Sequence, residues 1–431
     1  MSAGRILFGI CALILGGVVA FMVWAWRPPL APIEPPAASI FDPALIAKGA
    51  ELAAIGNCAL CHTNPGGRPF AGGLPIATPF GAIYSTNITP DVESGIGAWS
   101  EAAFRRAMHE GVDRDGRHLY PAFPYDHFTK TSDSDLAAIY AFVMTREPVR
   151  AATPPSKLPF PLDIRLITAG WQLLFFKEGE FRAEAAKSEM WNRGAYLVEG
   201  LGHCGSCHTP RNLFGAEEVQ HNLAGGEAEG WDAPALNSAS PAPVPWTEDA
   251  LFDYLRRGWD PAHGIAAGPM APVVRDLARV SDQDVRAIAA YIASLAGGSE
   301  QQRQKAAEEA RAFAKSRAWG VAAPGNPGKD GGEEIFAGAC AGCHRVAGTT
   351  PVELALSTAV NQPDPRNLIR ILIDGIMPED QKGPMMPGFA DVLTDQQVAA
   401  LVSYVRARFT ERPAWPNVAA RVHQIRDEER R

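Results

Sequence analysis

The run Cys-x-x-Cys-His occurs three times in this chain of 431 residues, and no other feature constrains the fold as strongly. With 7 cysteines and 10 histidines, roughly 0.003 accidental matches are expected, so chance does not explain three. A zinc site or a redox dithiol does not require a histidine directly after the second cysteine. In c-type haem attachment the two thiols bond to the haem vinyl groups and the histidine binds the iron. We therefore predict three covalently bound haem c groups, attached through Cys58, Cys61, Cys204, Cys207, Cys340 and Cys343 and ligated by His62, His208 and His344.

Charge and cysteine use narrow the functional class further. The seventh cysteine, Cys11, lies in an apolar N-terminal run, so no pair remains for a structural disulfide. The formal net charge of −8 and the pI near 5.7 exclude the basic surface that nucleic-acid binding requires. We therefore expect no nucleic-acid partner.

The N-terminal run has the length of a membrane span. Residues 6–26 contain no charged side chain, and at 1.5 Å per residue they extend about 31 Å, which is one bilayer core. Trp24 and Trp26 lie at one end, where interfacial aromatic residues belong. A cleaved signal peptide is the alternative, but residues 18–20 match a cleavage site only weakly. We expect an uncleaved anchor in the bacterial cytoplasmic (inner) membrane, with the haem domains facing the periplasm, because haem c is attached outside the cytoplasm.

Each haem motif is followed by two further helical patterns that repeat. The motif cysteines are separated by 146 and 136 residues, so these are duplicated domains rather than a solenoid. The pattern predicts an all-α fold, with an N-terminal transmembrane helix followed by three cytochrome c-like helical domains. The second helices start after Trp99, Trp246 and Pro363, with N-caps at Ser100, Thr247 and Asp364, and end at Gly111, Gly258 and Gly375; the closing helices start at Ser132, Ser281 and Thr394, with capping boxes or near variants.

One apolar run lies between two of the expected domains. Residues 171–176 either pack on their neighbours or contact the membrane surface or a partner subunit.

Composition sets the expected domain boundaries. The segments are an anchor (1–27), a proline-rich tether that lifts the first domain off the membrane (28–40), domain 1 (41–150), a linker (151–185), domain 2 (186–298), a helical and Gly/Pro-rich linker (299–328), domain 3 (329–412) and a charged surface tail (413–431).

The sixth iron ligand decides what each haem does, because methionine raises the haem potential. In small c-type domains this ligand lies on a loop just before the closing helix. Met270 precedes Ser281 by eleven residues, and Met386 precedes Thr394 by eight. We predict that Met270 and Met386 are the ligands, Met386 being preferred to Met385, with simple loop packing as the alternative.

The first domain departs from this pattern. Phe123, nine residues before Ser132, occupies the matching place, and phenylalanine does not bind iron. His127 lies on the same loop and is the favoured ligand. Two nitrogen ligands give a lower potential than histidine with methionine. An open or water-ligated iron remains an alternative, as do His118, His109 and Met108, although the equivalents of Met108 are the core residues Leu255 and Leu372.

Several longer motifs accompany the haem attachment sites. They are Thr78-Pro79-Phe80-Gly81, Asn87-Ile88-Thr89-Pro90-Asp91, Gly95-Ile96-Gly97-Ala98-Trp99, Arg193-Gly194-Ala195-Tyr196-Leu197-Val198, Gly202-His203-Cys204 through Pro210-Arg211-Asn212, and Met386-Pro387-Gly388-Phe389. With these motifs the chain resembles the three-haem cytochrome c subunits of bacterial membrane-bound periplasmic dehydrogenases, the group serving alcohol, gluconate and aldehyde dehydrogenases. The resemblance implies that it accepts electrons from a catalytic dehydrogenase subunit and passes them to ubiquinone or another downstream acceptor.

One variation inside the family bears on the partner. Many members carry methionine where this chain has Phe123. Phe123 together with Asp126-His127 is more similar to cytochromes paired with molybdenum hydroxylases that act on aldehydes or N-heterocycles.

Two other functions stay open from the sequence. A haem peroxidase-type enzyme would use an open first haem, and a cytochrome c subunit of a terminal oxidase would pair with other chains. We recognise no nucleophile and base set in the sequence, so no catalytic residue is assigned, and electron relay is the favoured function.

Overall fold

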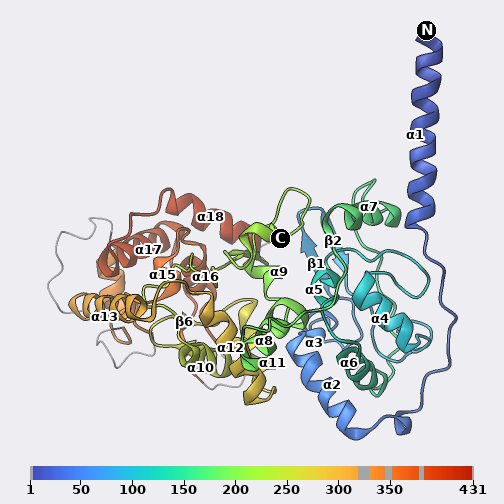
Figure 1. Ribbon diagram of the computed structural model, residues 1–431. Coiled ribbons are helices and arrows are strands. Elements are labelled where there is room, and N and C mark those ends of the chain that lie inside the picture. Colours follow the sequence, from blue (N-terminus) through green and yellow to red (C-terminus); the bar gives the residue numbers. More distant parts are fainter. Residues whose placement is uncertain (1–2, 319–330, 345–351, 378–382, 430–431) are drawn as a thin grey trace. The chain divides into compact units, whose positions relative to one another are not determined.

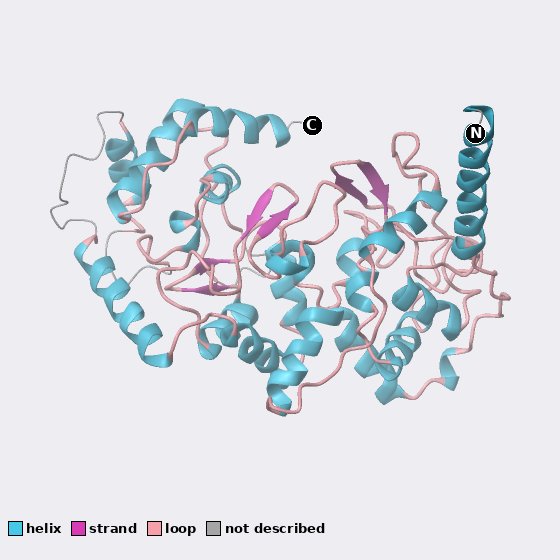
Figure 2. Cartoon of the chain, turned by 45° about the horizontal axis from the view of Figure 1, so that its top comes forward, coloured by secondary structure: helices cyan, strands magenta, loops and turns pink. Residues whose placement is uncertain are grey.

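The computed structural model describes residues 3–318, 331–344, 352–377 and 383–429 (Figure 1). Helices make up 49% of the described residues, whose strands form three two-stranded hairpins (Figure 2). The chain divides into two compact units, Met1–Ala183 with Glu199–His203, and Glu184–Val198 with Cys204–Arg431. The predicted all-α fold is confirmed.

One helix of the described residues, α1 (Ala3–Ala25), is long and apolar enough to cross a membrane, and none of the residues in its apolar window is buried. The proline-rich residues after it do not lift the first domain away, in contrast to the expectation from composition. Leu30 N–H donates to Arg114 O, Ile33 N–H donates to Ala98 O, and the Arg106 guanidinium donates to Pro28 O. An extended proline-rich segment leaves its backbone groups unpaired, so they bond to the domain surface instead.

The first repeat occupies unit 1. Asp42, Ser100 and Ser132 cap its three long helices through their side chains. The elements are the 3₁₀ turn η1 (Ala38–Ile40), α2 (Pro43–Ile55), α3 (Cys58–Cys61), β1 (Pro75–Thr78), β2 (Gly81–Tyr84), α4 (Glu101–Glu110), α5 (Tyr125–Phe128) and α6 (Asp133–Met144), followed by α7 (Arg165–Phe175) in the linker.

Unit 2 holds the other two repeats and the helix between them. The second repeat contains α8 (Glu189–Tyr196), η2 (Leu197–Leu201, of which Glu199–Leu201 belong to unit 1), α9 (Gly205–His208), η3 (Val219–His221), β3 (Gly226–Ala228), β4 (Trp231–Ala233), α10 (Glu248–Arg257), β5 (Trp259–Asp260), β6 (Gly264–Ile265), α11 (Met270–Leu277) and α12 (Asp282–Ser294). After α13 (Glu300–Ser316), the third contains α14 (Gly332–Ile335), η4 (Phe336–Cys340), α15 (Thr358–Asn361), α16 (Arg366–Asp374), α17 (Asp395–Phe409) and α18 (Val418–Glu429).

In every repeat the helix before the haem motif crosses the closing helix at a glycine. The pairs are α2 with α6, α8 with α12, and α14 with α17. A side chain does not fit at these crossings, because real Cβ atoms do not approach other atoms within 3.0 Å. A Cβ on Gly49 would lie 1.9 Å from Ala138 O, one on Gly194 would lie 1.9 Å from Ala287 O, and one on Gly332 would lie 2.4 Å from Ala400 O.

The predicted faces of the second helices are buried as expected. Ser100 and Thr247 cap α4 and α10 through their side chains, but α16 starts at Arg366, one residue later than predicted. There the Asp364 carboxylate still accepts the Arg366 N–H, so it satisfies one otherwise unpaired amide. The residues at the two predicted depths are all at most 8% exposed, and they are Phe104, Met108, Leu251, Leu255, Leu368 and Leu372.

The C-terminal residues differ from the expected surface tail. They form α18, which contacts α16 and α17, and its Val422 and Ile425 side chains are fully buried. Arg421 pairs with Asp364 at 2.7 Å, and Arg426 pairs with Asp395 at 3.0 Å. Apolar residues at 418, 422 and 425 have helical spacing, so the sequence did carry this signal.

Candidate haem sites

The three haem motifs share one backbone geometry. The amide N–H of each motif histidine donates to the carbonyl of the first motif cysteine at 3.0 Å, which closes one helical turn. Cysteines three residues apart on such a turn lie on the same face. Among the described residues, no cysteine forms a disulfide. The two thiols of each motif are therefore placed to bond to one flat group.

Two motif histidines are held by backbone carbonyls. His62 Nδ1 lies 2.6 Å from Thr86 O, and His208 Nδ1 lies 2.7 Å from Pro234 O. Since a carbonyl only accepts, Nδ1 carries the proton and Nε2 keeps its lone pair for a metal. Burial lowers the pKa of both imidazoles, which favours the neutral form that binds iron.

The third motif follows the same chemistry with one difference. Burial lowers the pKa of His344, and its buried Nδ1 has no hydrogen-bond partner within the part of the chain that the structure describes. Burial also raises the pKa of the first thiol in the second and third motifs, to about 12 for Cys204 and to about 11 for Cys340. Paired thiols beside a buried neutral imidazole fit the requirements of haem c.

The structure distinguishes the three methionines near the third haem motif. Met386 pairs with Ile376 through two backbone hydrogen bonds of 2.8 and 2.9 Å, and its side chain packs against the hydrophobic core. Met385 is 62% exposed and Met377 is 71% exposed. Neighbouring residues on an extended segment point to opposite sides, so only one of Met385 and Met386 faces the domain interior.

Backbone pairing relates Phe123 to Met270. Val112 pairs with His118 directly after Gly111, and Trp259 pairs with Ile265 directly after Gly258. Met270 lies five residues after the second of these pairs, as Phe123 does after the first. The partly buried Met270 begins α11, close to the Trp231 ring that lines Gly268.

The first repeat has aromatic packing where a sulfur ligand would lie. Phe123 contacts Phe128 edge to face, with 5.2 Å between ring centroids. His127 is 6% exposed, and its Nδ1 lies 2.8 Å from Glu199 O, which resembles the arrangement of His62 and His208.

The alternative first-haem ligands have other roles in the structure. His118 uses both ring nitrogens, with Nδ1 2.5 Å from Gln172 Oε1 and Nε2 2.7 Å from Ala25 O. His109 Nε2 lies 2.7 Å from Thr131 O. Met108 is 4% exposed on the helix face that Leu255 and Leu372 occupy in the other repeats. Both ring nitrogens of His118 are hydrogen-bonded, so His118 has no lone pair left for iron. His109, like His127, uses one ring nitrogen for a backbone carbonyl and stays an alternative ligand.

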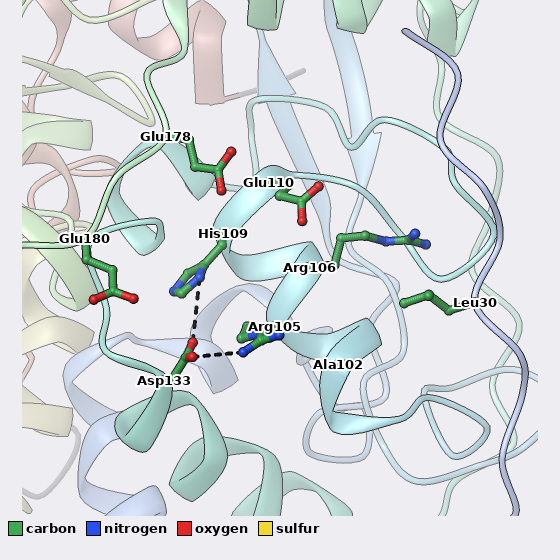
Figure 3. A pocket seen from close by; sticks show the side chains of 9 residues that line it. All are labelled: Leu30, Ala102, Arg105, Arg106, His109, Glu110, Asp133, Glu178 and Glu180. Atoms are coloured by element: carbon green, nitrogen blue, oxygen red, sulfur yellow. Dashed lines mark hydrogen bonds and ion pairs between the residues drawn. The ribbon is translucent and has the colours of Figure 1, made fainter. Parts of the chain in front are cut away.

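A pocket on the first repeat is charged and is not a haem site (Figure 3). Arg105 pairs with Asp133 at 2.8 Å, and His109 lies 4.0 Å from the same carboxylate. No cysteine or methionine lines this pocket, whose other residues are Leu30, Ala102, Arg106, Glu110, Glu178 and Glu180.

Sequence reasoning did not find the groups that orient the motif histidines. Thr86 and Pro234 act through backbone carbonyls, which every residue carries, so no residue type indicates them. Asn87 and Asn237, by contrast, have turn roles that their residue type suggests. Asn87 Oδ1 accepts the Thr89 N–H, and Asn237 Oδ1 accepts the Ala239 N–H.

Comparison with known proteins agrees with this site chemistry. The family described as Cytochrome c matches residues 46–147, 192–296 and 330–408. A nicotinate dehydrogenase component of Pseudomonas putida is 45% identical over 97% of this chain, which spans only about a third (35%) of that relative's length. Gluconate 2-dehydrogenase cytochrome c subunit of Pantoea cypripedii is 39% identical over 84% of this chain and 85% of its own length. Fructose dehydrogenase cytochrome subunit of Gluconobacter japonicus is 35% identical over 92% and 85%. The resemblance to cytochrome subunits of dehydrogenases is thus confirmed, and the chain belongs to the cytochrome c family and carries three c-type haems.

Proposed function

We propose that this chain is the electron-transfer subunit of a membrane-bound periplasmic dehydrogenase. It takes electrons from a separate catalytic subunit and passes them to ubiquinone or another respiratory acceptor. The observation that carries the proposal is three haem motifs, all with the same closed turn, in a chain that matches 85% of the length of two dehydrogenase cytochrome subunits.

The protein's part in this relay is to fix and tune each iron site. A haem held by the motif residues would supply one-electron ferric/ferrous chemistry. Thr86 and Pro234 hold the histidine rings in one tautomer and orientation through their carbonyls.

We further propose the sixth ligands. Met270 and Met386 bind the second and third irons, and His127 binds the first. Support for Met386 is its packing on the core, and support for His127 is its burial and its carbonyl-bound Nδ1. With two nitrogen ligands, the first haem has the lowest potential of the three.

Replacing the proposed ligand tests the first site directly. His127→Ala changes the absorption spectrum of the first haem, whereas His109→Ala leaves it unchanged. If His127→Ala leaves the spectrum unchanged, His127 is not the ligand.

The partner's substrate class follows from the same loop. Phe123 and His127 are similar to cytochromes that serve molybdenum hydroxylases, and one relative is named as a component of nicotinate dehydrogenase. We propose a catalytic partner that hydroxylates an N-heterocycle. We also propose that α1 anchors the chain in the inner membrane, with the haem domains in the periplasm.

Purification from native membranes tests the whole proposal. A tagged chain co-purifies with a dehydrogenase, and nicotinate, but not gluconate or ethanol, reduces the haems of the complex within the turnover time. If gluconate or ethanol reduces the haems instead, the proposed substrate class is wrong, but the proposed electron relay from a dehydrogenase stands. Co-purification with copper-haem oxidase chains, and no dehydrogenase, would overturn the relay from a dehydrogenase.

A further inference from the structure

The linker helix α7 has its apolar side chains on the outside. Leu173 is 58% exposed and Leu174 is 72% exposed. Gln172, on the side of α7 that faces the domain, is only 6% exposed. A helix on the surface of a water-soluble domain shows the opposite pattern. We call the exposed apolar residues the α7 face, which consists of Phe160, Ile164, Leu166, Ile167, Leu173 and Leu174.

The buried side of α7 holds the helix in this orientation. Gln172 Nε2 donates to Glu110 O and Gly111 O, so its Oε1 is turned toward His118 Nδ1, 2.5 Å away. Thr168 is 5% exposed on the same side. Turning the helix to hide the leucines would leave these buried polar groups unpaired, which costs more than one hydrogen bond each.

The α7 face lies beside the candidate membrane span. Helices α1 and α7 contact each other (Figure 1). A Cβ on Gly170 would lie 3.8 Å from the Phe21 ring. His118 bonds to both helices at once, because its Nε2 lies 2.7 Å from Ala25 O. The two helices are therefore fixed to the same part of the first repeat.

The depth of this contact matches that of a membrane-surface helix. Phe21 lies six residues before Arg27, the first charged residue after the span, so it sits about 9 Å below that residue along a helix. Trp24 and Trp26 lie between Phe21 and Arg27 and are 41% and 66% exposed. Such aromatic residues mark the depth of the interface between lipid and water. Interfacial helices bury their apolar faces by about 5–10 Å.

We propose that the α7 face lies in the lipid bilayer surface beside α1, as a second membrane contact of the first repeat. This inference rests on the proposed anchoring role of α1. Through Gln172 and His118, it also connects the segment between α4 and α6, which contains Phe123 and His127, to a membrane-bound helix.

Lipid photolabelling of the intact haem-loaded chain tests the proposal. The chain is reconstituted in phosphatidylcholine and phosphatidylglycerol vesicles that contain a phospholipid with a diazirine in its acyl chain, and labelled peptides are identified by mass spectrometry. We expect the peptide covering 160–177 to be labelled about tenfold more than the peptide with Leu213 and Val219, which are 93% and 81% exposed. If the α7 face is exposed to water only, both peptides are labelled equally, and this result would overturn the proposal.

Labelling of the α1 peptide distinguishes a failure of the proposed anchor from a failure of the proposed α7 face contact. If α1 is labelled and 160–177 is not, the anchor stands and the α7 face is a water-facing or protein-binding surface. If α1 is not labelled, the proposed anchor itself fails.

A matched pair of variants checks the side chains. The double variant Leu173→Asn with Leu174→Asn reduces labelling of 160–177 about fivefold or more, and its haem spectrum is unchanged, because these side chains do not pack inside the domain. Leu213→Asn changes neither. Undiminished labelling in the double variant would show that these leucines do not contact lipid.

Discussion

The first and second repeats use the same backbone at the sixth-ligand loop and fill it differently. In both, a hairpin follows the glycine that ends the second helix, closed by hydrogen bonds of 2.7 Å from Leu119 N to Gly111 O and from Ala266 N to Gly258 O. In the second repeat Met270 lies five residues after the paired residue Ile265, and in the first repeat Phe123 lies five residues after the paired residue His118. The two repeats therefore differ at one residue of a shared backbone position, and the proposed ligation of their haems differs with it.

The paired position itself shows a second difference. The second repeat has Ile265 there, whereas the first has His118, which bonds to Ala25 O and Gln172. The first repeat thus has Phe123 at the position of the proposed sulfur ligand, and its His118 connects to α1 and α7. The backbone hydrogen bonds of this loop are therefore the same in both repeats, whereas its side chains make different contacts in each.

Removing the sulfur from the second repeat should abolish the difference in ligation. Met270→Phe lowers the potential of the second haem by about 0.2 V, within the range of about 0.8 V over which axial ligands set haem potentials. The reason is that a thioether ligand stabilises ferrous iron. Redox titration followed by absorption measures the change. Met190→Phe is the control, because Met190 is 44% exposed in the same repeat and should cause no shift. An unshifted potential in Met270→Phe would exclude Met270 as ligand.

Much of this comparison could be predicted from the sequence, because side-chain type carries it. The motif cysteines and histidines, the N-caps at Ser100 and Thr247, and the buried helix faces follow from spacing alone. Counting back from the closing helices matches Phe123 with Met270 only approximately, at nine and eleven residues, and the backbone pairing aligns them at five residues. These features are local, so a linear pattern contains them.

The remainder depends on backbone atoms and on contacts distant in sequence. The carbonyls of Thr86 and Pro234 have no sequence signal. The docking of residues 28–33 on the first repeat depends on Arg106, which lies 78 residues from Pro28. Asp364 predicted a cap one residue too early, because Pro365 intervenes before the helix starts. Tertiary contacts, not local propensity, decided these cases.

The helix crossing is shared by both repeats, so it should respond equally in both. Gly49→Ala and Gly194→Ala each place a Cβ 1.9 Å from a carbonyl oxygen, and each destabilises its repeat by about 3 kcal/mol, the upper range for overpacking. Denaturant unfolding of the haem-loaded chain measures this. Gly338→Ala is the control and is near neutral, because nothing lies within 4 Å of its added Cβ. Tolerance of alanine at one crossing only would break the equivalence of the repeats.

Restoring the sulfur in the first repeat tests the comparison from the other side. Phe123→Met raises the first haem's potential by about 0.1 V, less than the change at Met270, because the new thioether competes with the existing ligand. The far-red absorption band of sulfur-ligated ferric haem reports whether the bond forms. Phe128→Met serves as the control, because it adds a sulfur to the same aromatic contact at a different loop position. A rise in potential in both variants would indicate altered packing rather than ligation.

The β hairpins give the smallest difference, which is one of pH dependence. The first repeat's hairpin, Pro75–Thr78 with Gly81–Tyr84, has no acidic residue, whereas β4 carries Asp232. Burial, and then the nearby Asp364 carboxylate, raise the pKa of Asp232 to about 6, against the opposing effects of Arg366 and Arg421. Its Oδ2 atom is buried with no hydrogen-bond partner within the described residues.

The raised pKa fixes the sign of the effect. Because the folded pKa lies above the unfolded value of about 3.9, the native state binds the proton more tightly and loses stability as the pH rises from about 4 to about 6. Asp232→Asn removes this loss, so we expect it to stabilise unit 2 by about 1–2 kcal/mol near pH 7.5 and not at all near pH 4. Thermal unfolding followed by circular dichroism at both pH values measures the difference, with Asp249→Asn as control, since that side chain is 89% exposed. A less stable Asp232→Asn near pH 7.5 would mean that Arg366 and Arg421 compensate the carboxylate fully, and the hairpins would then not differ in their pH response.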